Sequence, residues 1–181
     1  GISLADLDAG TASVQVTFST GSNATLLVNN AVTNGVTAGQ ISGNNTSAVT
    51  IVAPLSNINT TLVDATGLTY QPNLDVNGSD TLTVATSDLG NTGTGGALTD
   101  VDTVSITVDA VNDGPVNTVP GAQTIDEDTS LVISGISIVD VDSAGSDIQG
   151  TLSVNNGALA INTGVTNGVT AGQVTGNNSA S

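Results

Sequence analysis

Apolar and polar residues alternate with a period of two along four stretches of the chain. These stretches are SVQVTF at 13–18, TLTVAT at 81–86, DTVSITVDAV at 102–111 and TLSV at 151–154. Side chains on a β-strand point alternately to its two faces, so this alternation predicts strands that each bury one face. Clusters of Gly, Asn, Asp and Ser separate the stretches and predict turns.

One segment has a different spacing. Within PLSNINTTL, the apolar residues Leu55, Ile58 and Leu62 recur at intervals of three and four, which predicts one or two helical turns at an end of the fold. Many short strands joined by Gly-rich turns are typical of an all-β protein. The pattern therefore predicts an antiparallel β-sandwich of roughly 100 to 130 residues per domain.

The sequence repeats itself once. ISLADLDAG, which begins at Ile2, returns as ISIVDVDSAG, which begins at Ile136. TNGVTAGQISGNN, which begins at Thr33, returns as TNGVTAGQVTGNN, which begins at Thr166. The two spacings are almost equal, and such separate matches in the same order indicate a tandem duplication with a one-residue insertion or deletion.

The two copies cover different parts of the repeat. The first has no counterpart of VPGAQTIDEDTSLVISG at 119–135, and the second has no counterpart of residues 48–113. Pro115 and Pro120 interrupt strand pairing between the copies, so we expect domains at 1–113 and 114–181. The chain begins with Gly1 rather than Met, and we expect it to be a segment of a longer array.

The charge of the chain argues against several classes of partner. The 181 residues include 16 acids, almost all Asp, and no Lys, Arg or His, so the net charge is −16. Binding of nucleic acid or of an anionic membrane surface requires basic side chains, and we expect neither partner. No apolar run reaches the length of a membrane-spanning helix, so we expect no membrane insertion.

The composition nevertheless favours a folded domain. Hydrophobic residues make up 38% of the chain, although Phe18 and Tyr70 are its only aromatic residues. The absence of Cys excludes disulfides and thiolate metal sites, and the absence of Lys excludes Lys–Asn isopeptide crosslinks. Core packing, bound metal or both must therefore hold the chain rigid.

Several motifs together resemble the cadherin-like, immunoglobulin-type tandem repeats of very large bacterial surface adhesins, including RTX-type adhesins and VCBS-like repeat proteins. They are IDEDTSLVISG, ADLDAG and VDVDSAG, LTYQPNLDVNGSDTLTVATSDLGNTGTGG and VSITVDAVNDGPV. The resemblance implies tandem Ig- or cadherin-like antiparallel β-sandwich repeats, secreted or on a bacterial cell surface, with Ca²⁺ near the junctions between repeats. The chain departs from the pattern at Leu82, where a Phe is usual, and in having no Lys or Arg.

Clustered carboxylates repel one another and need a counter-charge, which this chain does not encode. Ca²⁺ binds carboxylate, carbonyl and Asn oxygens, and D-x-D can direct two of them at one ion. The candidates at the junction are Asn112, Asp113, Asp126, Glu127, Asp128, Asp140 and Asp142, with Asp6 and Asp8 as the same half-site in the first copy. In the cadherin-like pattern such groups converge between repeats; the alternative is an acidic, solvated surface.

Two further places are weaker candidates for Ca²⁺. DVNGSD supplies Asp75, Asn77 and Asp80, but it has no distant bidentate Glu and is equally typical of a turn. Asp88 stands at the end of a predicted strand, from which it could reach the junction. Asp100 and Asp102 form another D-x-D, which we interpret as a solvated start of a strand.

Three functions follow from these features. The first is a calcium-stiffened spacer in a bacterial surface adhesin or fibre that acts in cell adhesion or biofilm formation, with neighbouring repeats or identical head-to-tail subunits as partners. The alternative is a self-assembling extracellular filament or matrix subunit completed by strand exchange. A module that binds carbohydrate or ice has little support without an aromatic cluster or a regular TxT ladder. We expect no enzyme, because neither His nor Lys is present as a base.

Overall fold

The computed structural model describes residues 1–91 and 94–178, and its chain divides into two compact units. The first is Gly1–Val111 and the second is Asn112–Ser181, so the division falls just before the expected boundary. Each unit is considered by itself. Among the described residues, no helix has the length and apolar character that crossing a bilayer requires.

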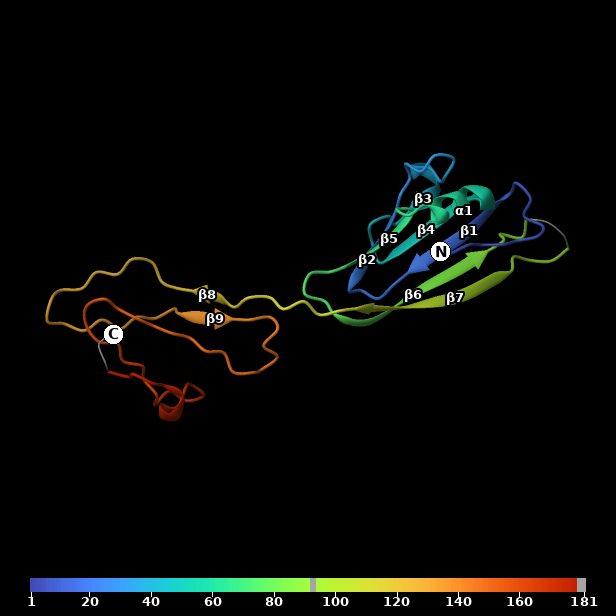
Figure 1. The fold of residues 1–181 in the computed structure, drawn as a ribbon. Coiled ribbons are helices and arrows are strands. Elements are labelled where there is room, and N and C mark those ends of the chain that lie inside the picture. The colour runs from blue at the N-terminus through green and yellow to red at the C-terminus, as the bar shows by residue number, and fades with distance from the viewer. Residues whose placement is uncertain (92–93, 179–181) are drawn as a thin grey trace. The chain divides into compact units, whose positions relative to one another are not determined.

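The first unit contains two antiparallel sheets (Figure 1). The larger has the order β3 (Ile41–Ser42), β4 (Ala48–Pro54), β1 (Ser13–Ser19), β6 (Gly78–Ser87) and β7 (Thr99–Val108). The smaller pairs β2 (Ala24–Val28) with β5 (Leu68–Pro72). The prediction of an antiparallel, β-rich fold is confirmed at this level.

Strand β1 lies at the centre of the larger sheet, and its alternating pattern explains its burial. Val14, Val16 and Phe18 are fully buried, while the residues between them are only partly buried. Phe18 is opposite Val49 of β4 on one side and Val84 of β6 on the other. Strands β1, β6 and β7 thus occupy stretches where the period-two pattern predicts strands.

The segment with helical spacing of its apolar residues also forms a helix. Helix α1 (Leu55–Val63) begins directly after β4 and buries Ile58 and Leu62 against the core, as the sequence predicts. Its buried Thr61 hydroxyl accepts a hydrogen bond from the backbone N–H of Val36 at 2.9 Å. This bond fixes the loop before the 3₁₀ helix η1 (Ala38–Gln40) onto the helix.

A single hydrophobic core joins both sheets and α1. Leu26 and Val28 of β2 pack in the same cluster as Val16, Ile51 and Ile58 from the other elements. All five are at most 1% exposed. The first unit therefore has a core of its own, built mainly from β-branched and Leu side chains.

The second unit has much less regular structure. Its elements are β8 (Val116–Thr118), β9 (Ser137–Val139), which pair antiparallel, and the 3₁₀ helix η2 (Ala171–Gln173). The prediction of a strand at TLSV is wrong, because residues 151–154 are irregular. Their counterpart in the repeat is the end of β1, which pairs with β4 and β6. The printed sequence holds no second copy of either partner strand, and a strand needs a partner to satisfy its backbone.

Local geometry is nevertheless duplicated between the units. The side chain of Asn44 accepts from the N–H of Val28 at 2.8 Å and donates to its carbonyl at 3.0 Å. Asn177, its counterpart in the second copy, makes the same pair of bonds to Ile161 at 2.7 and 3.1 Å. The side chains of Gln40 and Gln173 likewise accept from Thr37 and Thr170, in both cases at 2.8 Å. The sequence repeat is therefore also a structural repeat.

This duplication supplies a matched pair of variants. Asn44→Ala removes both bonds to Val28 and leaves a partly buried N–H and C=O without that partner, so we expect it to destabilise the first unit by about 1 to 2 kcal/mol. Asn177→Ala removes the same bonds beside the half-buried Ile161, and we expect less than about 0.5 kcal/mol. Urea denaturation followed by circular dichroism checks this; equal effects of the two variants would contradict it.

Candidate metal sites

Four carboxylates of the first unit line one hollow of about 490 Å³. Asp6 and Asp8 come from the N-terminal segment, Asp88 from the residue after β6, and Asp100 from the start of β7. The structure therefore brings together three of the predicted calcium candidates, Asp6, Asp8 and Asp88, from distant places in the chain. Asp100 lies at an exposed strand start, as expected, and adds a fourth carboxylate that was not among the candidates.

The D-x-D motifs of the two copies share one hydrogen bond. Asp6 Oδ1 accepts hydrogen bonds from the N–H groups of Asp8 and Ala9, each at 3.1 Å. In the second copy, Asp140 Oδ1 accepts from the N–H of Asp142 at 3.0 Å. One oxygen of the first Asp thus holds the turn in shape. The motif positions the second Asp at a fixed point of the chain.

Asp88 closes the loop that joins β6 to β7. Its Oδ1 accepts from the N–H of Gly90 at 2.8 Å and from that of Leu98 at 2.7 Å. These bonds favour the ionised carboxylate, and the Gly90 N–H contributes most to holding the pKa of Asp88 below its ordinary value. Asp88 is therefore a fixed negative charge on the wall of the hollow.

The calcium candidates that the sequence places at the junction between the two copies lie in the second unit. The N–H of Asp113 donates to Asp142 Oδ2 at 2.5 Å, and the side-chain amide of Asn112 donates to the carbonyl of Asp113 at 3.0 Å. This hydrogen bond joins the start of the unit to Asp142 of the second D-x-D motif. These residues are exposed, except for the half-buried Asp140.

The acidic triplet Asp126, Glu127 and Asp128 forms an exposed turn. Asp128 has a φ of 60°, and the hydroxyl of Thr129 donates to the carbonyl of Asp126 at 2.7 Å. This hydrogen bond lies within the turn and does not join the triplet to the D-x-D motif. Throughout residues 1–91 and 94–178, no group of three or more acidic side chains is arranged to hold a metal ion.

Asp80 has a structural environment that the sequence did not reveal. Its Oδ2 accepts from the hydroxyls of Thr20 at 2.5 Å and Tyr70 at 2.8 Å, and its Oδ1 accepts from the N–H groups of Thr81 at 2.7 Å and Gly21 at 3.3 Å. These contacts tie β6 to β5 and to the end of β1. The other two candidates of DVNGSD, Asp75 and Asn77, lie in the exposed turn before β6, where Asp75 has a φ of 59°.

The environment of Asp80 gives a pH dependence with a definite sign. Hydrogen bonds, of which that from Thr20 is the largest contribution, lower its pKa from 3.8 to about 2. A depressed pKa in the folded state stabilises the fold above pH 3.8, and this contribution is lost as the pH falls towards 2. We expect Asp80→Asn to lower the Tm by a few degrees at pH 7 and to flatten the fall in Tm between pH 4 and pH 2.

Thermal melting from pH 2 to pH 7 measures this effect, with Asp75→Asn as the control of equal charge change in an exposed turn. The account would be contradicted by a Tm profile of Asp80→Asn that parallels the parent chain at all pH values. Tyr70 supplies an independent reading, because burial and the neighbouring Asp80 raise the pKa of its phenol. Asp80→Asn should therefore move the spectroscopic titration of Tyr70 to lower pH.

No family model, curated protein or solved structure matches this chain. Its function is therefore inferred from the geometry of the repeats and from the chemistry of their acidic groups.

Proposed function

We propose that this chain is a structural repeat of an extracellular bacterial adhesin or fibre, in which immunoglobulin- or cadherin-like β-sandwiches follow one another as spacers. The observation that carries the proposal is the duplicated geometry of the Asn44 and Asn177 side chains at counterpart positions of the two copies. A chain that repeats a whole supersecondary unit, including its hydrogen bonds, is built for serial extension. The two sheets around one core support a sandwich as that unit.

Calcium fits the donor chemistry of this chain. Its candidate ligands are carboxylate and amide oxygens without any His or Cys, and a hard divalent cation prefers such a set. In the first unit, the candidate carboxylates are those of Asp6, Asp8, Asp88 and Asp100, and in the second those of Asp113, Asp140 and Asp142, with no more than two of them on one ion. Bound Ca²⁺ would supply the positive charge that the sequence lacks.

The geometry also limits how tightly calcium would bind. Because no three acidic side chains converge in the described parts of the chain, an ion would take at most two carboxylates and complete its shell with neutral oxygens and water. Few charged ligands give weak sites, comparable to the roughly 10⁻⁴–10⁻³ M range of extracellular modules. Such affinities suit a secreted or surface protein bathed in millimolar calcium.

The role of the ion in a spacer is mechanical. Calcium at the start of the second unit would neutralise the carboxylates of Asp113 and Asp142 and would restrain the start of that unit, where the N–H of Asp113 donates to the Asp142 carboxylate. A restrained segment resists bending and proteolysis. In this proposal the chain transmits position and force and has no catalytic group.

Thermal melting with and without calcium tests the proposal. For sites of about 0.1 to 1 mM, about 10 mM Ca²⁺ stabilises a fold by roughly 1.4 to 2.7 kcal/mol, which raises the Tm by about 5 to 15 °C for a domain of this size. We expect the calcium-dependent part of the rise to shrink in Asp88→Asn and to persist in Asp147→Asn, which removes the same charge from an exposed site outside the candidates. Limited proteolysis between residues 109 and 115 should slow in calcium. Identical melting in EGTA and in millimolar Ca²⁺ would refute the role of the ion.

A further inference from the structure

The larger sheet of the first unit has one face in the core and one outer face. Val16 and Phe18 of β1 point into the core, so the intervening Thr17 points to the outer face. Residues paired across neighbouring strands share a face, and the pairing therefore assigns the outer positions of all five strands. Those positions hold only Ser, Thr, Gln, Ala, Val and Pro. Across the middle of the face, the row of paired residues is Ser42, Thr50, Thr17, Ala85 and Val101.

The outer face is uncharged, although the whole chain carries a net charge of −16. The five strands are described in full, and none of their outer positions holds an acid. The acids of β6 and β7 lie on the core side, because Asp102 is paired with the buried Val84, and Asp80 and Asp100 alternate with these positions. Asp109 follows the end of β7 and is not part of the face. Another acidic chain can therefore approach this surface without meeting carboxylates.

The internal repeat keeps the outer positions of β1 and changes the core positions. Gln15, Thr17 and Ser19 return unchanged in the second copy as QxTxS at 149–153. The three core positions between and before them change from VxVxF to IxGxL. The outer position at the start of the strand is the exception, with Ser in the first copy and Asp in the second. Core positions are normally the more restricted because they must pack closely, so this reversal indicates that the outer face makes a contact of its own.

We propose that this outer face binds the same face of a second copy of the chain, sheet against sheet. Two copies repel wherever their carboxylates meet, and the outer face is a surface from which carboxylates are absent. A five-stranded sheet is twisted, and its complement is another sheet of the same twist, packed about 10 Å away with strands roughly 30° apart. Ser, Thr and Ala side chains are small enough to permit this approach.

The side chains of the face can be buried at low cost. The hydroxyls of Thr17 and Thr50 hydrogen-bond to each other at 2.9 Å, so each already has a partner inside the face. A hydroxyl that keeps a hydrogen bond is much less costly to remove from water than one that loses its partners. Val52 and Val101, which are 41 and 59% exposed, add apolar surface that the contact would cover.

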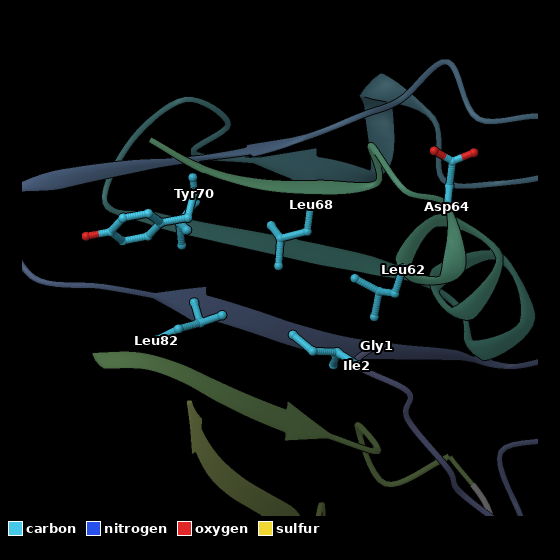
Figure 2. A pocket seen from close by; sticks show the side chains of 8 residues that line it. Gly1, Ile2, Leu62, Asp64, Leu68, Tyr70 and Leu82 are labelled. Carbon is cyan, nitrogen blue, oxygen red and sulfur yellow. The ribbon is translucent and has the colours of Figure 1, made fainter. Parts of the chain in front are cut away.

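The face does not suit a carbohydrate. Phe18 and Tyr70 are the only aromatic residues of the chain. Phe18 points into the core, and Tyr70 lies on β5 in the smaller sheet, on the core side with Leu68 and Leu82 (Figure 2). The outer face therefore has no aromatic ring on which a sugar could stack.

The size of the face predicts a weak contact. Strands lie about 4.8 Å apart and rise about 3.3 Å per residue, so β4, β1, β6 and β7 present roughly 500 Å² on each copy. A buried total of about 1,000 Å² is at the lower limit of specific interfaces. We therefore expect a Kd of about 0.1 to 1 mM for one pair of faces.

The contact joins chains side by side. Because the same face is used by both partners, the interface is isologous and has a twofold axis. In an array of the proposed repeats, each repeat would present such a face, and many weak contacts along two arrays would act together. The lateral contact thus goes beyond the spacer role, and it does not depend on calcium.

Sedimentation equilibrium of the full chain in EGTA, at concentrations up to about 1 mM and at about 0.15 and 0.5 M NaCl, tests the proposal. The parent chain should form dimers, more strongly at the higher salt, which screens the repulsion between acidic copies. Thr17 is on the central strand, close to the expected twofold axis, so Thr17→Asp brings two carboxylates together and should raise the Kd at least about tenfold. An equimolar mixture of Thr17→Asp and Thr17→Lys should recover dimers, because opposite charges then meet.

Two further variants separate this contact from general effects of charge and folding. Thr69→Asp adds the same charge at an exposed position of β5 in the smaller sheet and should leave the Kd within about twofold of the parent value. Thr103→Asp changes an exposed outer position of β7 and should also weaken dimers, which keeps the test valid if Thr17→Asp does not fold. Circular dichroism identifies the folded variants.

A parent chain that stays monomeric up to about 1 mM at both salt concentrations would overturn the proposal. So would dimers of Thr103→Asp as stable as those of Thr69→Asp. Binding of a neutral polysaccharide by a monomeric parent chain, lost in Thr103→Asp, would assign the face to a sugar instead. All these measurements exclude calcium, so their failure is distinguishable from a failure of the calcium-bound spacer.

Discussion

Gly67→Ala is expected to destabilise the first unit by more than about 4 kcal/mol, enough to unfold it at ambient temperature. Gly67 is buried where the chain turns back after α1, and a Cβ at this position would lie 1.7 Å from the carbonyl oxygen of Thr61. Two non-bonded atoms cannot approach so closely, so either the helix end or the start of β5 must move. Both movements disturb the core, because Thr61 and Leu62 are buried and Leu68 packs against the hydrophobic cluster that includes Leu62.

The local hydrogen bonds make this turn difficult to shift. The N–H of Gly67 donates to the carbonyl of Asp64 at 3.0 Å, and its own carbonyl accepts from the N–H of Asn29 at 3.0 Å. Gly39→Ala is the matched control, since a Cβ at Gly39 has no other atom within 4 Å. Urea denaturation should place Gly39→Ala within about 1 kcal/mol of the parent chain. A Gly67→Ala protein of parental stability would show that this turn is wrongly described.

Phe18→Ala is expected to cost about 3 to 5 kcal/mol. Phe18 is among the largest side chains that are fully buried, and it lies on the central strand between Val49 and Val84. Truncation leaves a cavity that strands on both sides of β1 cannot close without giving up their register. The change should appear as a lower urea midpoint with an unchanged slope.

The repeat again provides the control. Leu152 occupies the counterpart position of Phe18 in the second copy, and it is 51% exposed whereas Phe18 is 0% exposed. Leu152→Ala should therefore cost less than about 1 kcal/mol. If Leu152→Ala were as destabilising as Phe18→Ala, the second unit would have to bury this position, contrary to the structure.

The alternating pattern predicted those strands whose two faces differ in burial. In β1, apolar residues alternate with Ser, Gln and Thr, and the structure buries the apolar ones. The pattern does not predict β2, because Leu26, Leu27 and Val28 are three apolar residues in a row and do not alternate with polar ones. In the structure Leu26 and Val28 are buried, whereas Leu27 is 45% exposed. At TLSV the local pattern was that of a strand, yet pairing needs partner strands that the printed sequence does not contain a second time.

The sequence predicts which acidic residues are candidate ligands better than it predicts which of them lie near one another. One hydrogen bond of the D-x-D motif, from the N–H of the second Asp to the carboxylate of the first, follows from local geometry and is made at both Asp6 and Asp140. The meeting of Asp6 with Asp88 depends on how the N-terminal segment lies against the end of β6, which no short-range pattern specifies. Asp80 was a candidate because DVNGSD is similar to the start of a calcium loop, whereas its side chain accepts hydrogen bonds from Thr20 and Tyr70, which local sequence does not predict.

One signal for the structural Asn residues was present in the sequence. The motif that recurs at Thr33 and Thr166 keeps both Asn residues of its GNN end, although Ile41 and Ser42 change to Val174 and Thr175. The first of these, Asn44 or Asn177, holds a neighbouring segment by its backbone in both units. Retention within a repeat thus indicated a structural role that composition alone did not.

The central claim, that divalent cations supply the positive charge missing from this repeat, is tested most directly by calorimetric titration of the full chain with CaCl₂ at physiological salt. The account predicts saturable binding of at least one ion, with a Kd of about 10⁻⁴ to 10⁻³ M, that weakens in Asp88→Asn and is unchanged in Asp147→Asn. A titration without saturable heat up to about 10 mM Ca²⁺, roughly tenfold above the weakest expected Kd, at two temperatures would contradict it.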